Sequence, residues 1–546
     1  MQKLLSSLAG VVAFLVLPLV ALAQVKPAVV VSIASVSESL SDIGYITRAA
    51  GVPDAGKTAV LFGSAFTQGI DKSKPIGIFV SPADGDFQAV VAVPVTNLKE
   101  LLATFKEQIG DPRDAGDGIL EVGNANTFFV KQVGTWAFAA QQVSHLQKLP
   151  EDPAALLGDL PRRFNVAVQV NVQNIPKEYR QLAIDEIKSG FERAAEQGGG
   201  GDLDAELRER VSRNSLQQVI DLIEQADQLT VGLQIDPMTK KTFFDIEFTA
   251  LPGSKRAQVA ELNATPKSSF TGFLQPEAAL SLNFSGKMAA DEIETIKLTL
   301  KDLRTRASKE IDNDPNLDAK SRGAAKEVLA TLFDVLGTTL DGGKLDGGAV
   351  VLLDKKSIDF AAGGLLSDGV AIENAFKKLV DLSKNDPEFP AVKLDAGQHA
   401  GVKFHTLTAK VPDREGEARE LFGDKIDIVL GTGPKSLFVA FGKQAEPLLK
   451  RIIDQSATGV DEPQPVMQLT FALLPFLKFA SSVDPNPVVA EMAATLEKVA
   501  GSDKIRVRSK SIPRGESTRL EIDEGLLQLI GVGVKQAGVR LPGGRL

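Results

Sequence analysis

The strongest constraint on the fold is a strand–turn–strand–helix unit that occurs twice in the chain. The first copy spans residues 75–105 and reads PIGIFVSPADGDFQAVVAVPVTNLKELLATF. The second copy spans residues 348–380 and reads GAVVLLDKKSIDFAAGGLLSDGVAIENAFKKLV. Each copy has an apolar run, a polar turn containing Asp, a second apolar run opening on Phe87 or Phe360, and an amphipathic helix. The repeat indicates an architecture and does not indicate a reaction.

Other segments of the second half match segments of the first half in type and order. The matched pairs are residues 28–33 with 278–284, residues 135–140 with 436–441, and residues 164–172 with 466–471. Strict apolar–polar alternation over residues 164–172 predicts a half-buried strand, and short connections between strands favour antiparallel pairing. We therefore expect an α+β fold of two tandem homologous domains, each a mainly antiparallel sheet packed by helices.

The predicted domain boundaries follow from this repeat. At 546 residues the chain is too long for one hydrophobic core. We expect a signal peptide at residues 1–23, a first α+β repeat domain at 24–262, a linker at 263–276, and a second α+β repeat domain at 277–546.

The first 23 residues have the pattern of a secretory signal peptide. Lys3 supplies the positive start, an apolar core follows, and Ala21-Leu22-Ala23 is a suitable cleavage site. The alternative is an uncleaved anchor, although the apolar stretch is short for a membrane span. No later run approaches the ~18 apolar residues that a span needs. We therefore expect an exported, periplasmic or secreted protein with no transmembrane span after cleavage.

Composition limits the class of protein. The chain has no cysteine, so disulfides cannot stabilise it and burial of apolar side chains must do so. Hydrophobic residues make up 43% and charged residues 24%, which is typical of a folded globular protein. A net charge of −9 argues against nucleic acid as a general partner.

Residues 51–58, GVPDAGKT, match the phosphate-loop pattern GxxxxGK[ST]. A phosphate loop needs a buried strand before it and a helix after it, so that backbone amides surround the phosphates. The preceding residues instead predict an amphipathic helix, and the second half has no counterpart. We interpret the match as coincidence and expect no cofactor.

Metal and catalytic signatures are also weak. The three histidines are His145, His399 and His405, and no HExxH or GxSxG motif accompanies them. Residues 312–318, DNDPNLD, lack the glycine and the closing glutamate of a calcium-binding EF-hand, so a turn between helices is the better interpretation. We expect no catalytic residue and no metal ligand.

One candidate binding feature is a basic strand. Lys504, Arg506, Arg508 and Lys510 fall on one face of a strand because side chains alternate with a period of two. This face could bind a polyanion or an anionic lipid headgroup. Alternatively, it pairs across strands with the acidic residues Glu521 and Asp523, and we favour this second interpretation.

Two phrases carry a resemblance to known proteins. They are IDKSKPIGIFV at residues 70–80 and VGTWAFAAQQVSHLQKL at residues 133–149. With the two strand–helix units, they resemble exported planctomycete-type bacterial proteins of unknown function with a duplicated α+β domain. The resemblance implies export and a duplicated fold, and it supplies no catalytic residues.

Our leading hypothesis is an exported, non-enzymatic envelope or periplasmic protein with a binding or structural role. The first alternative is a carrier of an apolar ligand such as lipid, and the second is a hydrolase. The partner is unknown, and an envelope protein or a lipid fits the hypothesis. A carrier needs a continuous apolar cavity, an adaptor needs an exposed apolar patch, and a hydrolase needs ionisable groups that converge in a cleft.

Overall fold

A computed structural model describes the chain from residue 26 to residue 536. The described ranges are 26–83, 86–124, 127–147, 149–197, 205–315, 317–355, 357–383, 389–411, 416–459, 462–499 and 501–536. The predicted signal peptide lies outside them.

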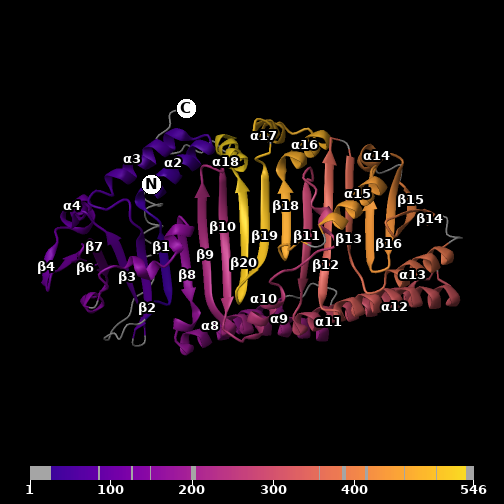
Figure 1. Ribbon diagram of the computed structural model, residues 1–546, viewed down its shortest axis with the longest axis horizontal. Coiled ribbons are helices and arrows are strands. Elements are labelled where there is room, and N and C mark those ends of the chain that lie inside the picture. The colour runs from indigo at the N-terminus through magenta and orange to yellow at the C-terminus, as the bar shows by residue number, and fades with distance from the viewer. Residues whose placement is uncertain are drawn as a thin grey trace.

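The strands in the described ranges form one 20-stranded sheet in which every pair of neighbours is antiparallel (Figure 1). The first ten strands, in spatial order from one edge, are β4 (Arg113–Gly116), β5 (Ile119–Val122), β6 (Phe128–Val133), β7 (Trp136–Ala140), β3 (Asp86–Pro94), β2 (Ile76–Ala83), β1 (Val29–Ile33), β8 (Val166–Asn171), β9 (Ala226–Asp236) and β10 (Lys241–Ala250). The sheet continues from β10 with β20 (Gly515–Asp523), β19 (Lys504–Ile512), β18 (Met467–Ala472), β11 (Leu280–Lys287), β12 (Lys344–Asp354), β13 (Ser357–Leu365), β17 (Ser436–Phe441), β16 (Lys425–Gly433), β15 (Val402–Lys410) and β14 (Ala391–His399).

The two halves of the sheet have the same strand order. Adding ten to each strand number of the first half gives the second half, read inward from the opposite edge. The antiparallel pair β10–β20 joins the halves, with Asp245 opposite Arg519. The predicted mixed α+β, antiparallel architecture is therefore confirmed. The two expected sheets, however, form one continuous sheet, because the last strand of each half pairs with the other.

Two sets of helices lie along the two ends of the strands (Figure 1). The upper rim contains α2 (Val36–Ala49), α3 (Pro53–Ala65), α16 (Leu473–Val483), α17 (Pro487–Glu497) and α18 (Glu524–Gln536). The lower rim contains α8 (Lys177–Gln197), α9 (Ala205–Gln225), α10 (Lys255–Leu262), α11 (Ala290–Asn313) and α12 (Ala319–Asp341). Among the described residues, no helix has the length and apolar character needed to cross a bilayer.

The remaining helices are mostly short. They are α4 (Leu98–Thr104), α5 (Lys106–Ile109), α6 (Ala154–Leu157), α7 (Leu160–Arg163), α13 (Gly369–Leu382), α14 (Gly416–Phe422), α15 (Ala445–Thr458) and the 3-10 turns η1 (Val143–Leu146), η2 (Val172–Asn174) and η3 (Thr271–Phe273).

The repeated unit predicted from the sequence corresponds to β2–β3–α4 and β12–β13–α13. Both helices begin with a side-chain cap: Asn97 accepts from the backbone N–H of Glu100 at 3.2 Å, and Asp368 accepts from that of Ala371 at 2.9 Å. A side-chain acceptor at this position satisfies one of the free N–H groups of the first turn. The same local chemistry therefore starts the helix in both halves.

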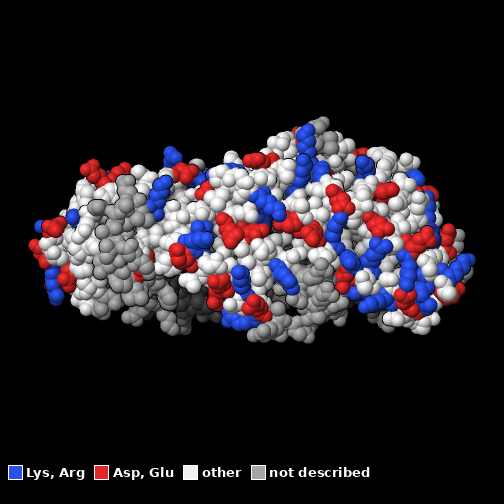
Figure 2. All heavy atoms as spheres, turned by 90° about the horizontal axis from the view of Figure 1, so that it is seen from below, with Lys and Arg blue, Asp and Glu red and all other residues white. Residues whose placement is uncertain are grey.

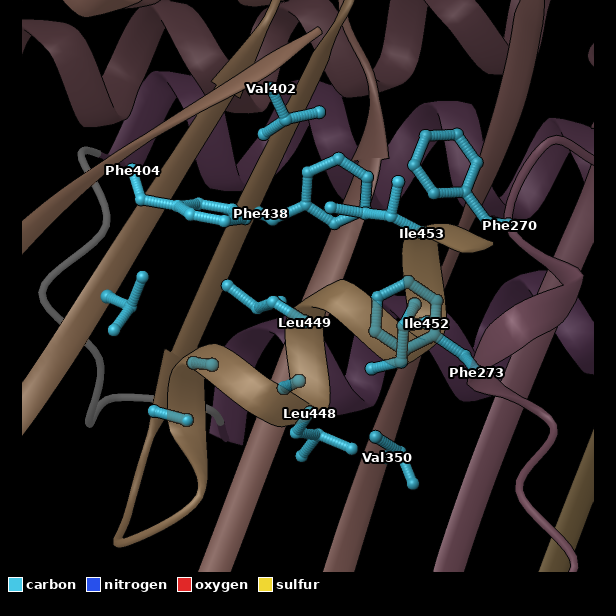
Figure 3. Packing of buried hydrophobic residues seen from close by; sticks show 14 of the residues in the cluster. Phe270, Phe273, Val350, Val402, Phe404, Phe438, Leu448, Leu449, Ile452 and Ile453 are labelled. Carbon is cyan, nitrogen blue, oxygen red and sulfur yellow. The ribbon is translucent and has the colours of Figure 1, made fainter. Parts of the chain in front are cut away.

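One face of the sheet, which we call the covered face, carries the two largest cores. In the second half, α15 lies over the strands, and Leu449 and Ile452 are fully buried against Phe438 (Figure 3). In the first half, η1, α6 and α7 occupy the corresponding place and bury Trp136 and Phe138.

The segment predicted to be a linker contributes to the second core. Phe270 and Phe273 are only 2% and 0% exposed and pack with Phe438 (Figure 3). Residues 263–276 thus include core positions of the second half.

The opposite face of the sheet carries one helix near each of its two ends. Helix α4 packs there through Leu98 and Leu102 against Ala137, and α13 packs through Ile372 near Leu437. We call this whole opposite face the open face.

Candidate functional site

Large apolar side chains are exposed on neighbouring strands in the middle of the open face. The residues and their exposed fractions are Val166 (38%) and Val168 (37%) on β8, Val231 (43%) on β9, and Phe244 (41%) and Ile246 (53%) on β10. Register places Val168, Val231 and Ile246 side by side in one row. We call these five residues the apolar floor.

The rows that contain the floor continue across the sheet without a charged residue. The first row is Ile78, Val31, Val168, Val231, Ile246, Thr518 and Ser509. The second row is Ile76, Ile33, Val166, Leu233, Phe244, Leu520, Val507, Leu469 and Leu282. The open face therefore offers a continuous apolar surface in its middle.

The sequence predicted the strand over residues 164–172, and the structure shows which side of it is covered. Ala167 is 1% exposed under the first core, whereas Val166 and Val168 point to the open face. The valines of the alternating pattern are thus on the less covered side. The alternation itself was visible in the sequence, but nothing in it tells which face receives a helix.

The four residues of the predicted basic strand lie in β19, on the covered face beside the β10–β20 junction. The Arg506 guanidinium contacts Glu521 at 2.6 Å and Asp523 at 2.8 Å, which is the cross-strand pairing that the sequence analysis favoured. Lys504 donates to the carbonyl oxygen of Pro276 at 2.9 Å. Arg508 lies 3.8 Å from Glu521 and, like Lys510, is exposed. Anion binding by this strand stays a prediction.

Further ion pairs join the two halves at this junction. Lys241 of β10 contacts Glu521 of β20 at 2.6 Å, and Arg519 of β20 makes two bonds to Asp245 of β10, at 2.7 and 2.6 Å. Asp245 and Glu521 are 3% and 5% exposed. Although burial opposes ionisation, Lys241 and Arg506 hold the pKa of Glu521 below its usual value. These pairs have a structural role because they neutralise carboxylates at the joint.

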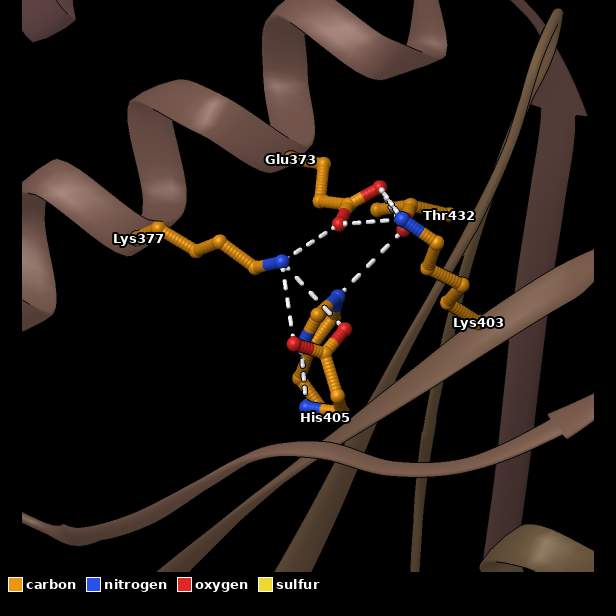
Figure 4. A network of polar contacts seen from close by, with 6 residues as sticks. Glu373, Lys377, Lys403, His405 and Thr432 are labelled. Carbon is orange, nitrogen blue, oxygen red and sulfur yellow. Dashed lines mark hydrogen bonds and ion pairs between the residues drawn. The ribbon is translucent and has the colours of Figure 1, made fainter.

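A second polar cluster forms where α13 meets β14, β15 and β16 (Figure 4). Glu373 of α13 is 4% exposed and contacts Lys377 at 2.7 Å and Lys403 at 3.0 Å. Lys377 also contacts Asp395 at 3.0 Å. His405 is fully buried beside them.

Hydrogen bonds define the protonation state of His405. The backbone N–H of Asp395 donates to Nδ1 at 3.1 Å, so Nε2 carries the proton and faces Thr432 Oγ1 at 3.4 Å. Burial lowers the pKa of His405, which keeps the ring neutral. Asp395 has a positive φ of 49° where the register of β14 shifts, opposite His405.

Glu373, Asp395 and His405 have ligand atoms within 4.8 Å of one another, a spacing that a metal ion could bridge. Two ammonium groups, however, already occupy the carboxylates. With His405 neutral, the charges of two carboxylates and two lysines cancel, so the cluster has no excess negative charge to attract a cation. The donor set does not fit a metal and fits a closed structural network. Its members come from four separate elements, α13, β14, β15 and β16, so the sequence shows no spacing motif for it.

The other sequence motifs fall on ordinary structural positions. Gly56, Lys57 and Thr58 lie inside α3, which follows another helix, so the phosphate-loop match is a coincidence, as predicted. His399 contacts Asp454 at 2.6 Å. Asp318 caps α12 through the backbone N–H of Ser321 at 2.7 Å, in the predicted turn between helices. The pKa of His145 is lowered by burial.

Three hollows in the described part of the chain lie away from both the polar cluster and the apolar floor. They measure about 370 Å³ between α11 and α12, about 530 Å³ between α2 and the α17–α18 pair, and about 360 Å³ beside α16. The polar cluster lines none of these three hollows.

Figure 2 shows the face of the molecule seen from below, which includes the lower rim. Lys and Arg side chains are interspersed there with Asp and Glu, and pairs such as Arg304–Asp334 (2.7 Å) and Lys326–Asp312 (2.6 Å) join α11 to α12. A region of one sign, as nucleic-acid binding would require, is not visible on this face.

Comparison of the chain with protein-family models, with curated proteins and with solved structures finds no match in any of the three.

Proposed function

We propose that this protein is a non-enzymatic binding protein of the cell envelope, and that it binds its partner through the open face. The observation that supports this proposal is the apolar floor, where five neighbouring large side chains are 37% to 53% exposed. Contiguous exposed apolar surface is costly in water and is typical of binding sites. Scattered single residues would carry no such argument.

A binding role also agrees with the ionisable groups. The polar cluster around Glu373 is neutralised by its own lysines, and the β10–β20 carboxylates are paired with arginine and lysine. Catalytic groups, by contrast, are commonly exposed to a cleft and left poised to exchange protons.

We further propose that the protein is exported and arose by tandem duplication. The signal-like residues 1–23 support export. The shared strand order, the equivalent position of α4 and α13, and their matching caps support a duplication of one α+β unit.

The test places a charge on the floor. Ile246→Glu puts a carboxylate at the most exposed floor position, and Met238→Glu, 93% exposed in the β9–β10 turn, places the same charge on the same hairpin away from the floor. We expect an apolar fluorescent dye of the anilinonaphthalene type to bind the wild type and Met238→Glu equally, and Ile246→Glu at least fivefold more weakly. Equal dye binding by all three proteins would contradict the proposal.

A further inference from the structure

The chemistry of the open face indicates what kind of partner it takes. Resting on the proposed function, we propose that the occupant is the hydrocarbon chain of a single lipid molecule, lying on the floor between α4 and α13.

The floor lacks the groups that recognise polar partners. The two rows through it contain aliphatic side chains, Phe244, and two hydroxyl residues at one end, and their backbone N–H and C=O groups are used in the antiparallel ladders. Recognition through hydrogen bonds or charge is therefore not available there. A hydrocarbon chain needs neither, because its binding comes from removal of apolar surface from water.

A protein partner would leave a different signature. The centres of protein interfaces are enriched in Trp, Tyr and Arg, which provide most of the binding energy. This chain has one Trp and two Tyr, and both Trp136 and Tyr45 are buried. A floor of four aliphatic side chains and Phe244, with no Trp, Tyr or Arg, fits a flexible methylene chain better.

The open face is covered above the floor and farther out on both sides. At the upper ends of β9 and β10, Ile235 and Thr242 continue the open face but are only 9% and 7% exposed. Helices α4 and α13 cover the same face farther out on each side. An acyl chain can lie on the uncovered middle of the sheet between these elements.

The rims provide further hydrocarbon-compatible surface. Of the 22 large apolar side chains that are exposed in the described part of the chain, five form the floor and thirteen lie on rim helices or at their ends. Examples are Leu61 (71%) on α3 and Leu182 (64%) on α8. Helix α11 buries none of its 24 residues, although Ile296 and Leu303 form an apolar stripe along it. Exposed apolar surface is thus divided between the floor and the two rims.

Chain length gives the direct test. Saturated fatty acids of increasing length compete with a fluorescent sixteen-carbon fatty acid for the purified protein. Full burial of a methylene would tighten binding about fourfold and half burial about twofold, so we expect a two- to fourfold gain per added carbon. A lysophospholipid with the same chain is expected to bind within about threefold of the fatty acid, since the floor has no charge for a headgroup. Affinity that does not change with chain length would overturn the inference.

Variants of the floor then test whether the acyl chain lies on it. We expect Ile246→Glu to weaken binding of the sixteen-carbon probe at least tenfold, with Met238→Glu unchanged. Val231→Thr keeps the β-branched shape that suits a strand and should weaken the probe about threefold, so the test does not depend on one variant folding. If both floor variants bind the probe with wild-type affinity, the acyl chain does not lie on this face.

The dye experiment separates this inference from the proposed function. Dye binding that depends on Ile246, combined with fatty-acid binding that does not, would leave a binding face with a different occupant. If Ile246→Glu binds both the dye and the fatty acid as tightly as the wild type does, both proposals are wrong.

Discussion

At the scale of single residues, buried ionisable groups away from the open face determine how stability varies with pH. Asp42 of α2 is 6% exposed and accepts a 2.7 Å hydrogen bond from Asn165 Nδ2. Burial, reinforced by the charge of Glu38, raises the pKa of Asp42 from 3.8 to about 6. Because the pKa of Asp42 is higher in the folded protein than in the unfolded chain, protonated Asp42 contributes to stability below pH 3.8. This contribution is lost as the pH rises through about 6.

We therefore expect Asp42→Asn to be more stable than the wild type at pH 7.5. The amide oxygen can keep the bond from Asn165 without a buried charge. The pKa shift corresponds to roughly 3 kcal/mol at most, so a gain of about 1–2 kcal/mol in the free energy of unfolding is expected. Urea unfolding at pH 7.5 and pH 4 measures it, with Asp54→Asn on the exposed start of α3 as control. A gain of the same size at pH 4 would show that the charge is not its cause.

His405 should make the protein sensitive to acid in the opposite direction. Its pKa is lowered by burial, so the unfolded chain takes up a proton below about pH 6.5 that the folded chain resists. This contribution is complete above pH 6.5 and is lost as the pH falls.

The measurement compares unfolding free energies at pH 7.5 and pH 5.5. We expect the wild type to lose about 1 kcal/mol more between these values than His405→Gln does. His399→Gln, which leaves the buried ring in place, should behave as the wild type. If His405→Gln shows the full acid loss, another group is responsible.

At the scale of elements, the β10–β20 pair is the critical contact because it alone makes one sheet of two. Asp245 is nearly buried, and Arg519 is its two-bond partner, with 45% of the arginine side chain exposed. Removal of one partner from such a pair leaves an uncompensated carboxylate.

Arg519→Met should therefore lower the free energy of unfolding by about 2 kcal/mol, a value reduced for the solvent around the arginine. Adding Asp245→Asn should recover part of this loss. Arg508→Met, which removes an exposed arginine 3.8 Å from Glu521, should cost less than about 0.5 kcal/mol. A double-mutant cycle from chemical unfolding gives the coupling, and a coupling near zero would contradict this account.

Much of each element was predictable from the sequence, and its surroundings were not. The alternation at residues 164–172 and the Asp-bearing turns of the repeated unit depend on neighbours in the chain, so they predict β8 and the two β-hairpins. The pairing of Asp245 with Arg519 depends on residues 274 apart, and Glu373 meets His405 only after the chain has folded back through β14. The local periodicity of the sequence does not predict contacts between residues that are distant in the chain. For the same reason the sequence specified two faces for β8 but not which face stays open.

At the scale of the whole molecule, one sheet through both halves implies that they support each other. The chain has a single tryptophan, Trp136, in the core of the first half, so its fluorescence reports that half, whereas circular dichroism reports both. We expect the two signals to give the same urea midpoint in the wild type. In a junction variant such as Arg519→Met with Lys241→Met, the midpoints should separate. Separate midpoints in the wild type would show that the halves unfold independently.

The outermost strands have a consequence for how copies of the protein behave when crowded together. A sheet edge is a row of unused hydrogen-bonding groups on which another chain can grow. Here β4 is only four residues long, and β14 is interrupted at Asp395, where the backbone N–H turns inward to the His405 ring. Neither edge therefore presents a long straight template. The sheet is already wide enough to begin a fibril. The irregularity at Asp395 prevents a strand of another molecule from pairing along this edge.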